Sequence, residues 1–294
     1  MSSVLHFHKT RIAPTPSGFL HVGNVLSFSM TTALARKTGA KILLRIDDMD
    51  QTRADARYIQ DIFDTLNFLE IPWDEGPANA ADFEKSYSQV HRLNLYDEAL
   101  EKLYDNGLIY GCECSRKQLA AQSCPCAQKC MPFDAPDVSW RLKTNGQTVL
   151  NIKDYAGNPI QSTLPPEMEN FVVKRRDGLP SYQLTSVIDD LFYGIDLVVR
   201  GQDLWSSTVA QHYLASALDE ERFADITFYH HPLLMESDGK KLSKSAGSTS
   251  IKYLREQGKT AADVFGMIGE MLGITESVTD WQKLSAFSGE QNNN

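Results

Sequence analysis

The sequence predicts an α/β protein with a parallel sheet, interrupted by an insertion rich in strands and cysteine. Three observations support this class. Residues 5–46 have the pattern of strand, loop, helix and strand, parallel-strand character returns at 195–201, and all five cysteines lie between Cys112 and Cys130. A β-loop-α-β unit is the building block of parallel sheets, which bind ligands at the carboxyl ends of their strands.

The composition is that of a folded protein with a core of its own. The 294 residues are 42% hydrophobic and carry 38 acidic against 29 basic side chains, a net charge of −9. Such a balance disfavours broad, sequence-blind binding of DNA or RNA, although a local basic patch remains compatible with docking RNA. There is no apolar run of membrane-spanning length and no secretory pattern at the first residues, so we expect no membrane partner and a cytoplasmic location.

The first elements follow from residue spacing. Residues 5–12 alternate as a strand does, and Pro14 and Pro16 exclude a regular ladder from the loop that follows. Apolar residues recur at helical spacing over 24–37, and Gly39 is placed to end that helix. Residues 42–46 (ILLRI) then predict a buried strand.

The remaining elements divide the chain into four segments. Helical patterns cover 54–70 and 95–109, strand-like pieces between glycine and proline turns fill 136–175, and strands are expected at 195–201 and 226–235. We therefore expect a first half of the catalytic domain over 1–106, an inserted subdomain over 107–180, the second half over 181–250 and a short helical segment over 251–294.

The stretch RIAPTPSGFLHVGN, residues 11–24, combines a strand, a stiff loop and a helix start that carries His21 and Gly23. Backbone N–H groups, an imidazole and the positive end of a helix at one point suit phosphate groups. The alternative is a strand-to-helix turn in which the histidine and glycine are incidental.

A second basic motif, KKLSKS, occupies residues 240–245. Lysines on a loop can neutralise the charge that grows on a leaving polyphosphate, and the sequence has no G-x4-G-K-[ST] phosphate loop that would do this differently. Taken alone, the run is more typical of a solvated surface.

Together the two motifs resemble the HIGH and KMSKS signatures of class I aminoacyl-tRNA synthetases. The blocks LLRIDDMD, WDEGP, GLPSYQLTSVIDD, VVRGQDL and HHPLLM extend the resemblance to the glutamyl-tRNA synthetase catalytic domain, over roughly residues 9–250. Members of that family have a large anticodon-binding domain after the second motif, for which this chain is too short. It is most similar to the truncated glutamyl-queuosine tRNA(Asp) synthetases, which share its length, its RG-x-DL block and a cysteine-rich insertion.

This resemblance implies a class I synthetase Rossmann-type catalytic domain with a zinc-containing insertion and a short helical C-terminal segment. It also implies activation of L-glutamate by ATP, with Mg²⁺, and transfer of glutamate to the queuosine base of tRNA(Asp). The catalytic residues would be His21, Lys241 and Lys244, and the ATP-binding residues would be His21, Gly23, Asn24, Lys241, Ser243 and Lys244.

Glutamate has two carboxylates and one ammonium, so a selective pocket is expected to offer two guanidinium groups and an acid. The resemblance supplies the glutamate-binding residues Arg11, Ile12, Ala13, Pro14, Thr15, Asp47, Tyr182 and Arg200. Asp47 would pair with the ammonium, in a position where the family more often has Glu. The alternative for the charged members is an ordinary ion pair or strand-end cap.

The cysteines predict a structural metal site. Cys112-x-Cys114 and Cys126-x3-Cys130 offer four soft ligands within 19 residues, with Cys124 as a spare. Four thiolates in a reducing compartment fit tetrahedral zinc, and the same spacing, Cys112, Cys114, Cys126 and Cys130, matches the zinc ligands of the related synthetases. An adventitious thiol cluster or a redox pair are the competing interpretations.

Two other functions stay open on the sequence. The chain could activate glutamate but charge the 3′ end of tRNA(Glu), or pass glutamate to a carrier that is not tRNA. It could instead be a non-catalytic relative that binds nucleotide or RNA, which the presence of His21, Gly23, Lys241 and Lys244 disfavours.

Overall fold

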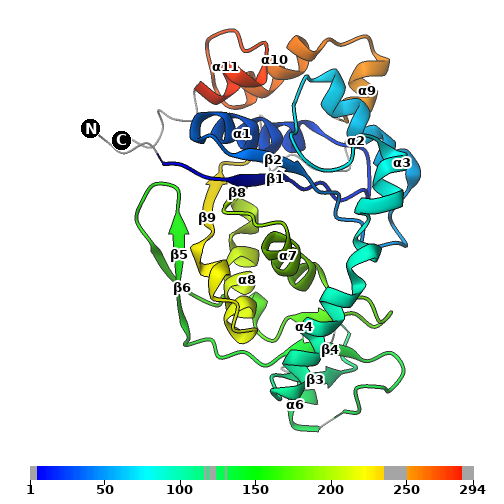
Figure 1. Ribbon diagram of the computed structural model, residues 1–294. Coiled ribbons are helices and arrows are strands. Elements are labelled where there is room, and N and C mark those ends of the chain that lie inside the picture. Colours follow the sequence, from blue (N-terminus) through cyan, green and yellow to red (C-terminus); the bar gives the residue numbers. More distant parts are fainter. Residues whose placement is uncertain (1–4, 116–117, 119–123, 130, 235–249, 287–294) are drawn as a thin grey trace. The chain divides into compact units, whose positions relative to one another are not determined.

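The computed structural model describes residues 5–115, 118, 124–129, 131–234 and 250–286. These residues fold into two compact units, each assembled from segments that are distant in the sequence (Figure 1). The first unit comprises Met1–Gln89, Ile195–Asp203 and Phe228–Asn294, and the second comprises Val90–Gly194 and Leu204–Thr227. The strand-rich insertion expected over 107–180 lies within the second unit.

The first unit contains the α/β arrangement that the sequence predicts. Its elements are β1 (Lys9–Ile12), α1 (Val22–Thr38), β2 (Lys41–Leu44), α2 (Ala56–Phe68), α3 (Ala80–Asp82), η1 (Phe83–Tyr87), η2 (Gln89–Arg92, which crosses into the second unit), β8 (Leu197–Gly201), η4 (Gln202–Leu204), β9 (Thr227–His231), α9 (Ile251–Glu256), α10 (Ala261–Met271) and α11 (Trp281–Ala286).

Parallel pairing of β1 with β2 organises this unit. The register runs from Lys9 opposite Lys41 to Ile12 opposite Leu44. Pairing continues past both strand ends. The Arg45 amide donates to the Ile12 carbonyl at 2.9 Å, and the Asp47 amide donates to the Pro14 carbonyl at 2.9 Å. The loop after β1 and the segment after β2 therefore stay side by side at the carboxyl edge of the sheet, where ligands of parallel sheets bind.

Helix α1 lies against this sheet and contacts both strands (Figure 1). Val25, Leu26 and Met30 are buried, each worth about 1.5–3 kcal/mol relative to exposure in water. The helix ends at Gly39 as its spacing predicts. On the other edge of β1, β8 lies beside it, with the Asp196 amide donating to the Lys9 carbonyl at 3.0 Å, and β8 is hydrogen-bonded in turn to β9.

The WDEGP block, residues 73–77, braces the free edge of β2. The Asp74 and Glu75 amides both donate to the Ile42 carbonyl, and the Glu75 carbonyl accepts from Leu44. Hydrogen bonds from the Lys9 ammonium, and also from Lys41, hold the pKa of the Glu75 carboxyl below its usual value, against the opposing effect of burial. Asp74 and Glu75 of this block thus hydrogen-bond to the edge of β2.

Gly76 makes this close approach possible. Its φ is 105°, and a Cβ there would lie 2.3 Å from the Leu44 carbonyl oxygen. The obstructing atom is backbone, which cannot turn aside as the end of a flexible side chain can.

The second unit is built from a helical layer and two antiparallel strand groups. Its elements are α4 (Leu93–Asp105), β3 (Ile109–Cys112), α6 (Cys126–Lys129), β4 (Ser139–Leu142), β5 (Val149–Asp154), β6 (Ile160–Thr163), η3 (Pro166–Met168), β7 (Val172–Lys174), α7 (Tyr182–Phe192), α8 (Trp205–Ala217) and η5 (Glu221–Asp225). Strands β3, β4 and β7 form one sheet, and β5 pairs with β6.

A buried ion pair fastens α7 to the start of α4. Arg92 donates from Nε and Nη2 to both oxygens of Asp189, at 2.8 and 3.1 Å, and the Tyr96 hydroxyl donates to the same carboxylate at 2.7 Å. Asp189 is fully buried, so removing either partner would leave a charge without compensation.

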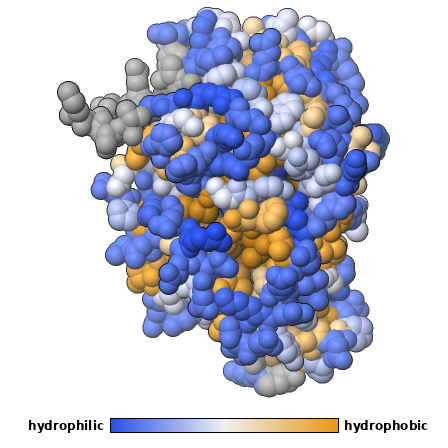
Figure 2. All heavy atoms as spheres, viewed as in Figure 1, coloured by the Kyte–Doolittle hydropathy of each residue, from blue (hydrophilic) through white to orange (hydrophobic). Residues whose placement is uncertain are grey.

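Polar and charged side chains cover most of the face drawn in Figure 2. Among the described residues, no helix is long and apolar enough to cross a membrane.

We expect Gly76→Ala to lower the free energy of unfolding by about 3 kcal/mol, because the new methyl group adds a backbone clash to the cost of a positive φ, itself about 1–2 kcal/mol. Gly157→Ala is the matched control, since its φ is 96° and nothing lies within 4 Å of the added Cβ. Urea unfolding followed by fluorescence measures both. Equal losses in the two variants would show that the Leu44 carbonyl moves aside without cost.

Candidate functional site

His21 begins α1 as its N-cap residue. Its Nδ1 accepts from the Gly23 amide at 3.1 Å, and the Asn24 side-chain oxygen accepts from the His21 amide at 3.0 Å, which forms a reciprocal capping box. Because Nδ1 acts as an acceptor, the neutral ring carries its proton on Nε2. His21 is thus oriented by the backbone of its own helix, with a donor at the far side of the ring.

Gly23 is required by the histidine beside it. A Cβ at position 23 would lie 2.9 Å from His21 Cε1 and 3.0 Å from Nδ1. The sequence resemblance predicted that this glycine binds ATP. The structure adds a second reason for a glycine here, which is that it leaves room for the His21 imidazole. Asn24, the other residue of the motif, has the capping role just described.

The loop after β1 shares its backbone with the segment after β2. Ile12 and Pro14 are buried and their carbonyls accept the amides of Arg45 and Asp47, whereas Thr15 is exposed. Ala13, between them, is half-buried. This pairing fixes the path of the chain from β1 towards His21.

Two of the predicted arginines lie on strands that neighbour each other. Arg11 is on β1 and Arg200 on β8, and both are buried, with 6% and 4% exposed. The Arg200 guanidinium lies 5.0 Å from the centre of the Phe228 ring. Two buried guanidinium groups thus lie on strands that contact each other, although β1 and β8 are assigned to different sheets.

Arg200 also acts on a histidine of β9. Burial, together with the nearby charge of Arg200, lowers the pKa of His230 to about 3, and burial also lowers the pKa of His231. Both imidazoles are therefore neutral at pH 7 and add no positive charge at this edge of the sheet.

Asp47 makes an ion pair within its own segment. Arg45 donates from Nε to Oδ1 at 2.7 Å and from Nη2 to Oδ2 at 3.1 Å, and both side chains are buried. The alternative of an ordinary ion pair is thus present in the structure. A ligand ammonium at Asp47 would have to share this carboxylate with Arg45, a residue that the sequence interpretation did not single out.

The other predicted residues fall outside this set. Tyr182 belongs to the second unit, where it begins α7 with 42% of its side chain exposed. Lys241, Ser243 and Lys244 lie outside the described residues.

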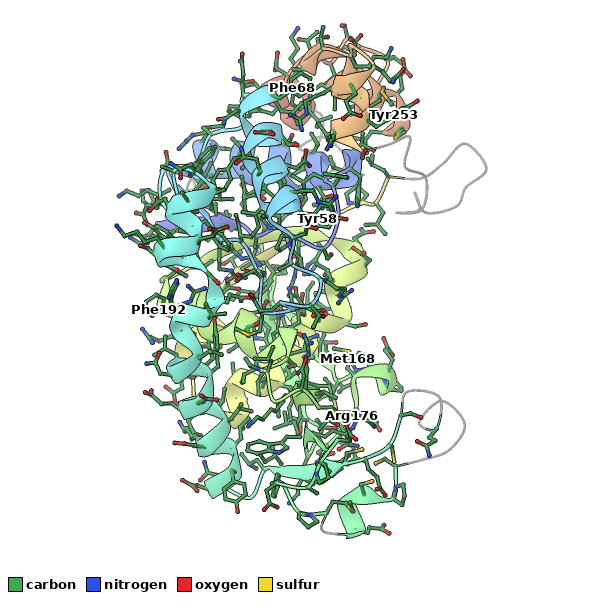
Figure 3. The ribbon with its side chains drawn as sticks, turned by 90° about the vertical axis from the view of Figure 1, so that its right-hand side faces the viewer. Tyr58, Phe68, Met168, Arg176, Phe192 and Tyr253 are labelled. Atoms are coloured by element: carbon green, nitrogen blue, oxygen red, sulfur yellow. The ribbon has the colours of Figure 1, made fainter. Side chains whose placement is uncertain are left out.

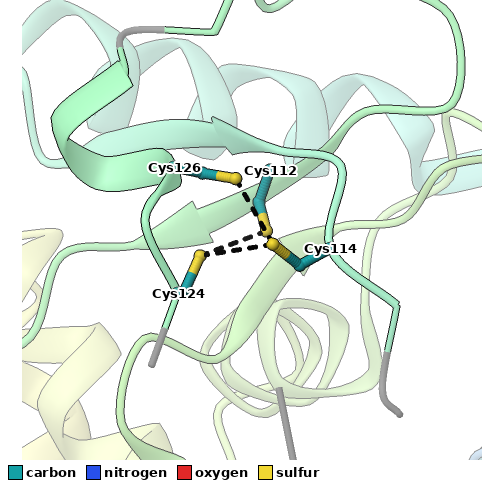
Figure 4. Close-up of side chains that lie close together, drawn as sticks. All are labelled: Cys112, Cys114, Cys124 and Cys126. Atoms are coloured by element: carbon teal, nitrogen blue, oxygen red, sulfur yellow. Dashed lines mark hydrogen bonds between the residues drawn. The ribbon is translucent and has the colours of Figure 1, made fainter. Parts of the chain in front are cut away.

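Four cysteines of the second unit converge on one point (Figure 4). Their Sγ atoms all lie within 4.8 Å of one another, in the set Cys112, Cys114, Cys124 and Cys126. Cys112 ends β3, Cys114 follows two residues later, and Cys126 begins α6. All four are free thiols.

The geometry of this cluster suits a single tetrahedral ion. The Sγ atoms of Cys112 and Cys124 lie 3.6 Å apart, those of Cys114 and Cys126 lie 3.5 Å apart, and those of Cys124 and Cys114 lie 3.9 Å apart. Four sulfurs at about 2.3 Å from zinc would stand about 3.8 Å apart. Burial and the neighbouring thiols raise the pKa of Cys114 to about 12, so only a cation would make the group a good ligand at neutral pH.

The cluster differs in one residue from the predicted ligand set. Cys124, which the sequence interpretation kept as a spare, is a full member, whereas Cys130 lies outside the described residues. The signal was present in the sequence, since Cys124-x-Cys126 repeats the spacing of Cys112-x-Cys114.

Comparison with known proteins places these features in one family. Residues 8–129 and 127–285 match the family described as "tRNA synthetases class I (E and Q), catalytic domain". The glutamate–tRNA synthetase of Elizabethkingia anophelis has the same fold, with a TM-score of 0.72 over 95% of this chain and 65% of that chain, at 20% identity.

Curated relatives carry two kinds of name. A glutamyl-Q tRNA(Asp) synthetase of Nitratidesulfovibrio vulgaris is 32% identical, covering 90% of this chain and 86% of that protein. One of Synechococcus sp. is 35% identical, covering 91% and 84%. A glutamate–tRNA ligase of Nitrosomonas europaea is 33% identical over 95% of this chain, which spans only 62% of that protein.

The family match extends over most of the chain, and these relatives exceed 30% identity. The chain belongs to the class I tRNA synthetases of the E and Q group, through their catalytic domain.

Proposed function

We propose that this protein activates L-glutamate with ATP and transfers it to the queuosine base of tRNA(Asp). The observation that carries the acceptor is the name shared by several well-covered relatives. Three relatives that are 32–35% identical to this chain, matched over 84–87% of their own length, are named glutamyl-Q tRNA(Asp) synthetase. The cysteine cluster also supports this choice, because a cysteine-rich insertion is a feature of the synthetases that the sequence resembles most.

In the proposed first step, a glutamate carboxylate oxygen attacks the α-phosphorus of ATP. The bond from that phosphorus to the β-phosphate oxygen breaks, giving glutamyl-adenylate and pyrophosphate. Catalysis of such transfers is mostly positioning and charge compensation. His21 Nε2–H and the amino end of α1 would meet the phosphates, Mg²⁺ would accompany ATP, and Lys241 and Lys244 would neutralise the departing pyrophosphate.

Recognition of glutamate is assigned to the sheet edge. Arg11 and Arg200 would hold the carboxylates, and Asp47 would receive the ammonium beside Arg45. In the second step a hydroxyl of queuosine attacks the activated carbonyl, so that AMP leaves and an ester to the base remains.

The cysteine cluster is proposed to hold one structural zinc ion, with Cys124 completing the set of Cys112, Cys114 and Cys126. Zinc would fasten β3 to α6 and take no part in the reaction. Four free thiols at one point persist only in a reducing compartment, which supports a cytoplasmic location.

The acceptor is tested with radiolabelled glutamate, ATP and tRNA(Asp) that either contains or lacks queuosine. We expect label on the queuosine-containing tRNA alone, and we expect ribonuclease digestion to leave it on an internal fragment and not on the 3′-terminal adenosine, because the base is the acceptor. Label on the 3′ end of tRNA(Glu) would instead support charging of that tRNA. Pyrophosphate exchange without any labelled tRNA would point to another carrier.

The glutamate pocket is tested with Arg200→Ala in glutamate-dependent ATP–pyrophosphate exchange. Loss of a charge-assisted contact worth about 1.5–3 kcal/mol raises KM for glutamate about 10- to 100-fold. KM for ATP should stay near the wild-type value. Arg200→Lys, which keeps the charge but not the planar fork, is expected to fall between the two, and an unchanged KM for glutamate in Arg200→Ala would remove this residue from the pocket.

Zinc is tested by elemental analysis of protein purified without chelator. We expect one zinc per chain in the wild type and less in Cys124→Ser, with a lower temperature of unfolding because metal binding contributes folding energy. Cys130→Ser is the control. Loss of zinc in this control but not in Cys124→Ser would restore the ligand set predicted from sequence, and a wild type without zinc would refute the site.

A further inference from the structure

Leu20, the residue before His21, is held from two sides. Its amide donates to Asp61 Oδ2 at 3.3 Å, and its carbonyl accepts from the Ile251 amide at 2.7 Å. Leu20 is 3% exposed. The peptide groups on both sides of this residue are therefore fixed before the chain reaches the start of α1.

The two holding groups are themselves joined. Asp61, on α2, accepts from Arg255 Nη2 at 2.5 Å with its other oxygen. Arg255 is on α9, the helix that begins at Ile251. A closed ring results, from Leu20 to Asp61, to Arg255, along one turn of α9 to Ile251, and back to Leu20. We call Asp61, Ile251 and Arg255 the Leu20 clamp.

Neighbouring contacts reinforce the same arrangement. The Phe19 ring packs edge-on against Tyr58 of α2, with ring centres 4.9 Å apart, and Lys252 Nζ of α9 lies 4.4 Å from the centre of the Phe19 ring. Figure 3 shows α2, from Tyr58 to Phe68, beside α9, which carries Tyr253. His21 also forms an isolated β-bridge with Ser250. The turn that leads to His21 is thus enclosed between two helices.

Stability alone does not account for the charge at position 61. Burial raises the pKa of the Asp61 carboxyl above its usual value, against the opposing effects of the Leu20 amide and Arg255. A carboxyl with a raised pKa contributes stability below its ordinary pKa and loses it as pH rises through the folded value, so the ionised group is held at neutral pH at a cost. An apolar side chain would avoid that cost, but it would leave the Leu20 amide and the Arg255 guanidinium without this acceptor.

We infer that Asp61 is a positioning residue for His21. By accepting both the Leu20 amide and the Arg255 guanidinium, it fixes the N-cap of α1 relative to α9, whose first residue follows Ser245 of KKLSKS by six positions in the sequence. The kinetic part of this inference rests on the proposed function, in which His21 meets the ATP phosphates. Asp61 itself touches no substrate.

The chain offers a matched set of variants. Asp61→Ala removes both acceptors, Asp61→Asn keeps one neutral acceptor, and Arg255→Gln breaks the link from the α9 side. Asp64→Asn is the control, because Asp64 is one turn along α2 and lies 3.8 Å from Arg255 Nη1 without contacting Leu20. Asp61 and Arg255 line an open pocket of about 720 Å³, so water can enter where a side chain is shortened. Circular dichroism at the assay temperature checks that each variant is folded.

Glutamate-dependent ATP–pyrophosphate exchange gives the first readout. A misplacement of about 1 Å can cost about a hundredfold in rate, so we expect Asp61→Ala to lose about 10- to 100-fold in kcat/KM for ATP, with smaller losses in Asp61→Asn and Arg255→Gln. KM for glutamate should change by less than about twofold, since His21 is assigned to phosphate and not to the amino acid. A purely structural role would instead lower the active fraction and leave both KM values unchanged.

Hydrogen–deuterium exchange of the peptide that contains Leu20 gives a second readout, which requires no activity. We expect faster exchange of this amide in Asp61→Ala, and wild-type protection in Asp64→Asn and in Arg255→Gln, which retains the carboxylate. Unchanged protection in Asp61→Ala would overturn the inference. Faster exchange combined with ATP kinetics equal to those of Asp64→Asn would overturn it too.

Failure of the proposed function is recognised separately. A wild type with no glutamate-dependent exchange refutes that function, and the inference is then decided by Leu20 protection together with ATP affinity from calorimetry. Weaker ATP binding in Asp61→Ala than in Asp64→Asn supports positioning of His21, and equal binding contradicts it.

Discussion

The parallel pairing of β1 with β2, continued beyond the ends of both strands, is the constraint from which the candidate site follows. Amides of the segment after β2 bond to carbonyls of the loop after β1, so this loop cannot leave the sheet edge. Arg11 lies on the strand before the loop and Asp47 beside it. The same loop then leads to Leu20 and His21. There, residues of α2 and α9 hydrogen-bond to Leu20.

Two buried ion pairs also hold segments of the chain in place, one in each unit. Arg45 fixes Asp47 in the first unit, and Arg92 fixes Asp189 in the second. Each pair is buried and bidentate, a geometry in which a guanidinium fork offsets the loss of hydration. Such pairs specify one arrangement more sharply than apolar contacts do, because a shifted helix or loop would leave a charge without its partner.

The sequence was sufficient for the parts of this fold that depend on local pattern. Helix α1, its end at Gly39 and the strands on either side were predictable from apolar spacing and from the prolines of the first loop. The capping box of His21 and Asn24 was not predictable in this way, because histidine is not among the residues that usually cap a helix. The Leu20 clamp could not be predicted from the sequence for a different reason. It joins residues 20, 61 and 255, and no local pattern reports contacts at such separations.

The cysteine site lies between these cases. A thiol cluster was predictable from the close spacing of the cysteines, but spacing does not determine which of them converge. The interpretation of Asp47 was limited in a similar way, since the sequence shows a carboxylate near a predicted pocket without showing that Arg45 occupies it.

The contact between Gly23 and the His21 ring has a consequence for how this motif can change over evolutionary time. Because a methyl group at position 23 would collide with the imidazole, the two positions are epistatic. A residue larger than glycine at position 23 is therefore expected to be tolerated better once the histidine has been replaced. Among related sequences, loss of the histidine is expected to precede loss of the glycine.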